Sequence, residues 1–176
     1  MEIKDYLKNS EKTLSTKFYY DEKISEPEVF IALQHFMGAG KNLDIIKKRK
    51  FYGKNVESPF DIKDEKFFNG IVYKRDYNEA EKLLHAAIGI GTESSEIIEA
   101  VFKAKYQDKQ LDVVNIEEEL GDLMWYIAIL LREYDIDFHK LLQKNIDKLK
   151  ARYGEKFSEE KANNRDLKTE RNILEK

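Results

Sequence analysis

The chain has 176 residues, of which 41% are hydrophobic and 37% charged, and its formal net charge is −3. This length suits one sizeable domain, and the near balance of charges does not favour a protein that binds nucleic acid stably. The absence of cysteine excludes disulfides, thiolate metal ligands and a cysteine nucleophile. Only two prolines and eight glycines interrupt the sequence, so a mostly helical chain is predicted.

The N-terminal region shows no targeting signal. Met1 to Asp5 are charged where a secretory signal requires an apolar run, and no segment has the length of a membrane span. We therefore expect a cytoplasmic protein without membrane contacts.

Helices are predicted near residues 3–15 and from Pro27 to about Lys50. The second prediction rests on Pro27, which suits a first helical turn.

An aromatic-rich segment follows these two helices, and most of its rings are expected to pack against helices. Its members are Phe51, Tyr52, Phe60, Phe67, Phe68 and Tyr73.

Three long helical patterns occupy the second half of the chain. Apolar residues recur at steps of three and four over residues 78–106, and helices are also predicted over 115–134 and 137–153. Asp137 is a good N-cap, and Gly154 supplies a stop signal. Because the linkers are short and polar, neighbouring helices are predicted to form antiparallel hairpins.

Two pairs of carboxylates lie in the first two of these helices. Glu93 and Glu96 are three residues apart, as are Glu119 and Asp122, and residues i and i+3 of a helix share a face. A helical plot places each pair beside the apolar face, where an ionised carboxylate is costly unless it is compensated. Four carboxylates without histidine or sulfur predict a hard ion, Mg²⁺ or Mn²⁺, rather than Zn²⁺.

These acids allow two other interpretations. An ordinary solvated helix face is the bland alternative, but two spaced pairs beside small residues favour a metal site. A di-iron carboxylate bundle requires Glu-x-x-His on its helices, and neither pair contains the histidine.

The motif Glu93-x-x-Glu96, followed after a gap by Glu119-x-x-Asp122, resembles the signature of the all-alpha nucleoside triphosphate pyrophosphohydrolases. This superfamily includes MazG, dimeric dUTPase, the dCTP pyrophosphatases and the phosphoribosyl-ATP pyrophosphatases. The resemblance covers roughly residues 78–160. Its context looks like the MazG-like branch and comprises His85-Ala-Ala-Ile-Gly-Ile-Gly-Thr-Glu, Glu117-Glu-Glu-Leu-Gly-Asp-Leu-Met-Trp-Tyr and Asn145-Ile-Asp-Lys-Leu-Lys-Ala-Arg-Tyr.

The resemblance implies an all-α fold, an antiparallel helical bundle completed by oligomerisation. Residues 78–154 would form the catalytic core, residues 1–77 would pack on it or cover it, and residues 155–176 would be a charged arm, docked or loose, with all three parts in one compact domain. The wide apolar faces leave one side of the core uncovered, so a homodimer or a homotetramer is predicted.

The resemblance also implies a metal-dependent hydrolase that converts a (d)NTP to a (d)NMP and pyrophosphate. Both carboxylate pairs would hold the metal. Family members often carry an extra acid just before the first metal-binding Glu, where this chain has Thr92. Glu118, Glu99 and a metal-ligating Glu are the candidates for the general base, and the sequence does not choose between them.

Substrate contacts are expected from several positions. Tyr126 matches a family position that helps to enclose the nucleotide, whereas Trp125 lies on another face and is expected in the core or an interface. His85 is a candidate for the pocket lining, although a lone helical histidine is more often structural. Polar residues on one stripe of the third helix are expected to bind phosphate oxygens: Asn145, Lys148 and Arg152.

Three alternative functions stay open at this stage. Within the same fold, the chain is an enzyme of narrow specificity for one substrate, such as dUTP, dCTP or phosphoribosyl-ATP. From other classes, the chain is a nucleotide-binding regulatory module without turnover, or a purely structural bundle.

Overall fold

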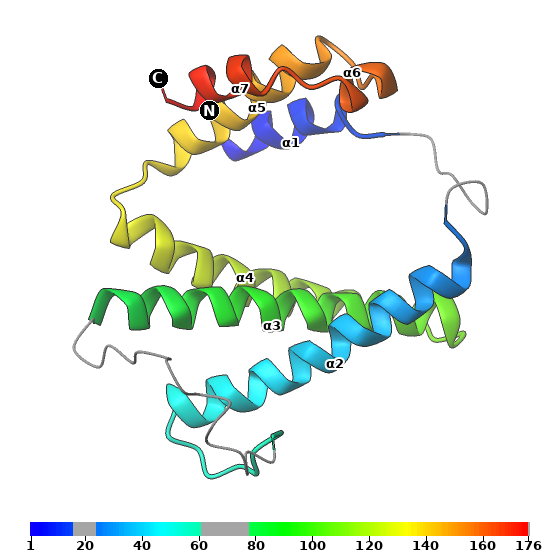
Figure 1. The fold of residues 1–176 in the computed structure, drawn as a ribbon, viewed down its shortest axis with the longest axis vertical. Coiled ribbons are helices and arrows are strands. Elements are labelled where there is room, and N and C mark those ends of the chain that lie inside the picture. The colour runs from blue at the N-terminus through cyan, green and yellow to red at the C-terminus, as the bar shows by residue number, and fades with distance from the viewer. Residues whose placement is uncertain (16–23, 61–77, 176) are drawn as a thin grey trace, which may run out of the picture. The chain divides into compact units, whose positions relative to one another are not determined.

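The computed structural model of the protein describes residues 1–15, 24–60 and 78–175, and these residues form helices and no strand (Figure 1). The predicted all-α class is thereby confirmed. The helices in chain order are α1 (Ile3–Glu11), α2 (Glu26–Lys50), α3 (Asn78–Tyr106), α4 (Val113–Glu133), α5 (Phe138–Tyr153), α6 (Glu159–Asn163) and α7 (Leu167–Leu174).

The helix boundaries follow the predicted start and stop signals. Ser25 and Glu28 form a capping box at the start of α2, in which the Ser25 N–H donates to Glu28 Oε2 at 2.9 Å. Asp137 caps α5 by accepting the N–H of Lys140 at 3.0 Å. Gly154 ends α5 with a φ of 77°, a conformation that glycine adopts without strain.

Contacts within the chain divide it into two compact units. One consists of Ile24–Glu133, and the other combines Met1–Lys23 with Tyr134–Lys176. The boundary falls between α4 and α5, inside the stretch 78–154, so the single domain with its core at 78–154 stays a prediction. No helix in the described residues is long and apolar enough to cross a membrane.

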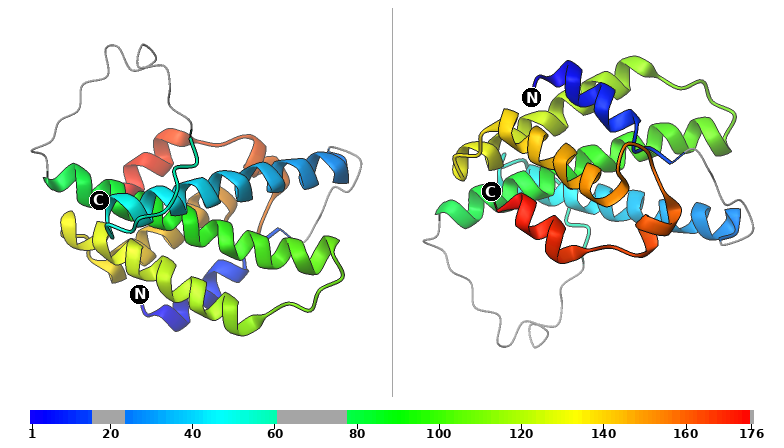
Figure 2. Two further views of the ribbon diagram at one scale, coloured as in Figure 1. Left: turned by 90° about the horizontal axis from the view of Figure 1, so that it is seen from below. Right: turned by 90° about the horizontal axis from the view of Figure 1, so that it is seen from above.

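In the unit formed by Ile24–Glu133, α3 packs against both α2 and α4, as Figure 1 and Figure 2 show. Phe30, early in α2, lies against Phe102, late in α3, with ring centroids 4.9 Å apart. Lys82, early in α3, pairs with Glu133 at the end of α4 at 3.2 Å. Both neighbours therefore run opposite to α3. The buried cluster between α3 and α4 consists of Ala86, Tyr126 and Ile129, with Ile90 and Leu130 packed against it.

Two glycines allow these helices to approach closely. A methyl group added at Gly40 of α2 would lie 2.3 Å from Ser95 Cβ, and one at Gly89 of α3 would lie 2.2 Å from the Tyr126 ring. Both distances are far below van der Waals contact. Because Gly89 and Ser95 lie on α3 on either side of Glu93, the two close contacts fix α2 and α4 against the same short stretch of α3.

In the other unit, α1, α6 and α7 pack on α5. Leu142 and Ile146 are the buried apolar residues of α5, and the Tyr6 hydroxyl of α1 donates to Asn145 Oδ1 at 3.1 Å. The amphipathic α5 is therefore covered by the two ends of the chain.

A buried carboxylate docks α7 on α5. Glu170 accepts hydrogen bonds from Arg152 Nε at 2.7 Å and from Arg165 Nη2 at 2.7 Å. These bonds lower the pKa of Glu170 to about 2, and the bond from Arg152 has the larger effect. Within this unit, α6 and α7 of the charged C-terminal segment therefore pack on α5.

Glycine packing at the α2–α3 contact can be tested by one substitution at two positions of α2. Gly40→Ala should lower the free energy of unfolding by about 1–3 kcal/mol, because the methyl group overpacks against Ser95. Gly38→Ala is the matched control, since nothing lies within 4 Å of its added methyl group; it should stabilise by about 0.5–1 kcal/mol through helix propensity. Urea denaturation measures both, and equal effects would contradict the close contact.

Candidate metal site

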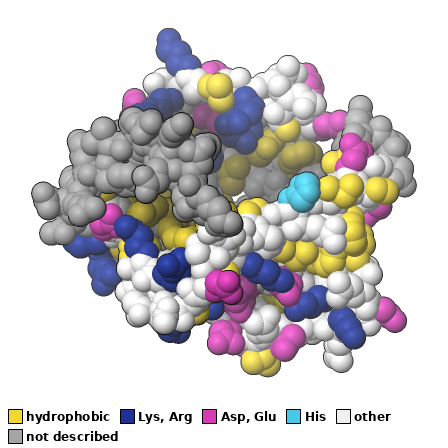
Figure 3. Space-filling view, turned by 60° about the horizontal axis from the view of Figure 1, so that its bottom comes forward, with side chains coloured by type: hydrophobic (Ala, Val, Ile, Leu, Met, Phe, Trp, Pro, Cys, Tyr) yellow, Lys and Arg dark blue, Asp and Glu magenta, His cyan; other side chains and the backbone are white. Residues whose placement is uncertain are grey.

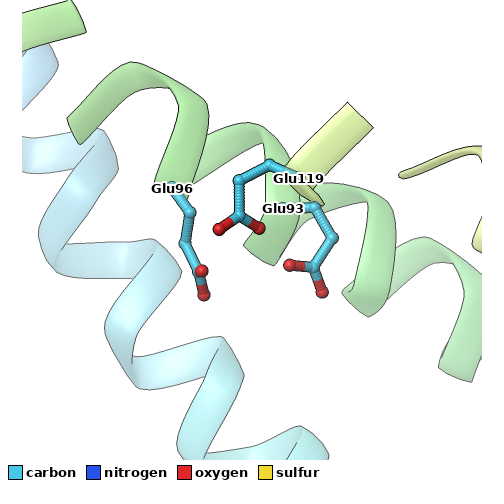
Figure 4. Close-up of side chains that lie close together, drawn as sticks. All are labelled: Glu93, Glu96 and Glu119. Carbon is cyan, nitrogen blue, oxygen red and sulfur yellow. The ribbon is translucent and has the colours of Figure 1, made fainter. Parts of the chain in front are cut away.

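Three carboxylates converge between α3 and α4. Glu93 and Glu96 of α3 and Glu119 of α4 each offer an oxygen atom within 4.8 Å of the others, and Figure 4 shows them directed toward a common space. Glu93 is 4% and Glu119 5% exposed, whereas Glu96 is exposed. We refer to Glu93, Glu96 and Glu119 as the carboxylate cluster.

A cavity of about 390 Å³ lies beside the carboxylate cluster, within the range of small-ligand pockets. Its walls come from all three helices of the unit, because α2 contributes residues facing the acids of α3 and α4. The lining includes Gly40, Lys41, Asp44, Thr92, Ser95, Glu96, Glu99, Lys103, Asn115 and Glu119. The cluster therefore borders a space large enough for a phosphate group.

The carboxylate cluster is electrostatically unfavourable when all of its members are ionised. Burial, followed by the charge of Glu96, raises the pKa of Glu119 to about 7, and burial together with Glu93 raises that of Glu96. A hydrogen bond with Glu96 adds to the raised pKa of Glu119, whereas the bond that Glu119 accepts from Asn115 Nδ2 at 2.7 Å acts to lower it. Near neutral pH the cluster thus gains from any added positive charge.

Lys47 of α2 supplies a positive charge inside the protein. Its Nζ donates to Glu93 Oε1 at 2.7 Å and to Thr92 Oγ1 at 2.8 Å, and Asp44 Oδ1 lies 3.5 Å away. Burial acts to lower the pKa of Lys47, but the hydrogen bond and charge of Glu93 outweigh it, so that pKa is raised. Sequence reasoning missed Lys47 and Asp44. Their spacing from Gly40 places them on one helix face, but nothing in that spacing connects the face to Glu93.

The remaining predicted acids lie around the carboxylate cluster rather than in it. Asp122 is exposed one turn beyond Glu119 and is not among the three convergent carboxylates of the described chain. Glu118 is exposed and does not line the cavity. Glu99 lines the cavity and pairs with Lys103 at 2.9 Å and Lys41 at 3.2 Å.

A group of aromatic side chains lies at the C-terminal end of α2. The ring of Phe51 stacks on His85 with centroids 4.2 Å apart, and the Tyr52 hydroxyl lies 2.8 Å from that of Tyr126 and 3.4 Å from His85 Nε2. Burial, followed by the charge of Lys47, lowers the pKa of His85. Packing of Phe51 against a helix is confirmed. Phe67, Phe68 and Tyr73 lie outside the described residues.

Tyr126 and Trp125 differ in exposure. Tyr126 is 5% exposed, and its ring contacts Gly89, so it belongs to the core. Trp125 is 54% exposed and meets the Tyr126 ring edge to face. Trp125 is therefore not a core residue, and its place in an interface stays a prediction.

The predicted phosphate-binding residues of α5 belong to the other compact unit. Arg152 is held by Glu170 and Asn145 by Tyr6, and Lys148 is partly buried. Phosphate binding by Asn145, Lys148 and Arg152 stays a prediction.

The donor atoms of the carboxylate cluster suit a hard divalent ion. Three carboxylates supply only oxygen ligands, and the raised pKa values of Glu96 and Glu119 show that the site lacks positive charge. No cysteine is available to favour a soft metal. The residues therefore fit Mg²⁺ or Mn²⁺.

Paired acids on two helices beside a cavity are the arrangement expected of the all-alpha pyrophosphohydrolases. The sequence profile of the MazG nucleotide pyrophosphohydrolase domain matches residues 82–157. Gene 37 protein of Mycobacterium phage L5 is 33% identical over 82 residues, which are 44% of this chain and 71% of that protein. No solved structure matches the chain. The chain belongs to the MazG nucleotide pyrophosphohydrolase family, which confirms the resemblance in its sequence.

The raised pKa of Glu119 predicts a characteristic dependence of stability on pH. The folded protein binds this proton with a pKa of about 7, against an ordinary value of 4.5. The metal-free protein should therefore lose about 3 kcal/mol of unfolding free energy as the pH rises from 4.5 through 7. Glu119→Gln should remove most of this loss, because its amide donates to Glu96 and accepts from Asn115 without a charge.

Urea denaturation between pH 5 and 8 in the presence of EDTA measures this effect. Glu117→Gln is the matched control, since Glu117 is exposed and lies outside the cluster, and it should keep the slope of the unsubstituted protein. If the unfolding free energy of Glu119→Gln falls with pH as steeply as that of the unsubstituted protein, the raised pKa does not belong to Glu119.

Proposed function

We propose that the protein is a metal-dependent nucleoside triphosphate pyrophosphohydrolase that cleaves a (d)NTP to a (d)NMP and pyrophosphate. The observation that carries the proposal is the convergence of Glu93, Glu96 and Glu119 beside a cavity that Glu96 and Glu119 line, in a chain of the MazG family. Oxygen ligands at the edge of a phosphate-sized space are what hydrolysis of a phosphoric anhydride requires.

Glu93, Glu96 and Glu119 would hold Mg²⁺, which Mn²⁺ can replace, and Asp122 is the proposed fourth ligand on the face of Glu119. When bound, the ion supplies charge neutralisation at the phosphoryl oxygens and a water of lowered pKa. The protein's own contribution is to keep three mutually repelling carboxylates close together in a partly dry site.

A carboxylate must also accept the proton of the attacking water. Glu118 was a candidate, but it does not line the cavity. Glu99 does, yet its hydrogen bonds with Lys103 and then with Lys41 lower its pKa and make it a weaker base. These contacts favour a carboxylate of the cluster itself, such as Glu96, which is exposed and faces the cavity.

Two lysines support binding of the triphosphate in the cavity. Lys41 of α2 and Lys103 of α3 line the cavity and are both largely exposed while paired with Glu99. Exposed ion pairs are weak in water, so phosphate oxygens can replace Glu99 as their partner at little cost. In this arrangement Lys41 and Lys103 bind the phosphates not held by metal.

Self-association is the proposed means of covering the apolar surface of α4. Leu120, Met124 and Trp125 are exposed on this helix, and apolar side chains are open to solvent on the face drawn in Figure 3. A second copy of the chain would bury such a surface, in a homodimer or in a homotetramer of dimers.

The oligomeric state is tested by light scattering of the full chain at micromolar concentration. The expected mass is at least twice the 20.8 kDa of one chain, and Trp125→Glu should shift it toward the monomer because a charge enters the apolar surface. A monomeric unsubstituted protein would refute self-association.

Hydrolysis is tested with a panel of NTPs and dNTPs, including dUTP and dCTP, in the presence of Mg²⁺, with products separated by chromatography. Monophosphate and pyrophosphate are expected. Glu119→Gln should reduce kcat/KM by about two orders of magnitude or more, as expected when a metal ligand or base is lost. Glu117→Gln, next to the site but exposed, should retain the rate.

The other outcomes of this panel select among the alternatives. Turnover of a single substrate would indicate a narrow-specificity enzyme of the same fold. Diphosphate and phosphate as products would show that the bond between the β and γ phosphates is cleaved, which contradicts the proposed reaction. Metal-dependent nucleotide binding without turnover would favour the regulatory module, and unaltered metal affinity in Glu119→Gln would favour a structural bundle.

A further inference from the structure

Lys47 is held in the protein interior by groups from all three helices of its unit. The three N–H donors of its ammonium face oxygens of Glu93, Thr92 and Asp44. The ring of Tyr126 lies beneath it, with its centroid 5.5 Å from Nζ. The Thr92 hydroxyl is itself fixed, because it donates to the Gly89 carbonyl at 2.9 Å.

The exposure of Lys47 separates it from the other lysines around the cavity. Its side chain is 7% exposed, against 40% for Lys48 and 66% for Lys41. An exposed lysine changes its rotamer freely, whereas removal of a partner from a buried lysine leaves an uncompensated charge. The ammonium of Lys47 is therefore a fixed charge of the site.

The charges at the carboxylate cluster nearly balance with one divalent ion. Lys47 offsets one of the three carboxylates, which leaves two negative charges when all are ionised. One divalent ion cancels these two charges and leaves only that of the exposed Asp122, the proposed fourth ligand. Asp44 does not alter the balance, because it is also paired with Lys48.

We propose that the Lys47 ammonium is a resident cation of the carboxylate cluster, which takes the place of a second metal ion so that the substrate-free protein binds one divalent ion per chain. This inference rests on the proposed function, since it assumes that the cluster binds metal. Lys47 is a positioning residue: it occupies one oxygen of Glu93 and leaves the rest of the cluster to the ion.

The test is the number of Mn²⁺ ions bound per chain, measured without nucleotide from the electron paramagnetic resonance signal of free Mn²⁺. The unsubstituted protein should bind one ion. Lys47→Met, which keeps an unbranched side chain one atom shorter and removes its charge, should bind two. Lys50→Met is the matched control, because Lys50 also lies on α2 and pairs with Glu81 of α3, outside the cluster, and it should bind one.

A folding control accompanies these titrations. If Lys47→Met does not fold, as judged by circular dichroism, Lys47→Gln replaces it, because its amide can donate to Thr92 and Glu93 without a charge. Two ions in Lys47→Gln then support the proposal, and one ion overturns it.

The outcomes separate this inference from the proposed function. Two ions in the unsubstituted protein, or one ion in Lys47→Met, would overturn the role of Lys47 even if pyrophosphate is released from NTPs. Neither Mn²⁺ binding nor pyrophosphate release by the unsubstituted protein would instead remove the proposed function, and this inference with it.

Discussion

Mutual repulsion of buried carboxylates is the constraint on which the α2–α3–α4 unit depends. Two helices that bring Glu93 and Glu119 out of water beside Glu96 meet an electrostatic penalty that their apolar contacts must overcome. The protein reduces this penalty in two ways within the described structure. Glu119 retains a proton near neutral pH, and α2 inserts Lys47 against Glu93. Helix α2 therefore forms part of the wall of the site and also stabilises its charges.

Close helix packing is what gives these charges their short distances. Glycine at positions 40 and 89 lets α2 and α4 approach α3 within a few residues of Glu93. Lys47 lies two turns beyond Gly40 on α2, and this spacing carries its ammonium to Thr92 and Glu93. Steric and electrostatic requirements therefore fall on the same stretch of α3, where a small shift of either neighbour would alter both.

Local sequence signals predicted the helices well, because periodicity and capping act within a few residues. The bounds of α3, the Asp137 cap and the Gly154 stop follow from such signals. The i and i+3 spacing also predicted that Glu93 and Glu96 share a face. Glu119 of the second pair joins them, whereas its predicted companion Asp122 is not among the convergent carboxylates of the described residues. Lys47 was not predicted, because its partners lie 45 and 46 positions away and no local pattern links α2 to α3.

Tyr126 shows why a position matched to a family motif does not by itself define a contact. Its ring is buried against Gly89, its hydroxyl meets that of Tyr52, and its face lies under Lys47. A ring with contacts on these sides supports the ammonium and, through it, Glu93. Any effect of Tyr126 on a bound nucleotide then passes through neighbours that remain exposed, of which Tyr52 shares its hydrogen bond and Trp125 its ring edge. Substitution of Tyr126 would disturb the charge balance of the cluster before it removed a nucleotide contact.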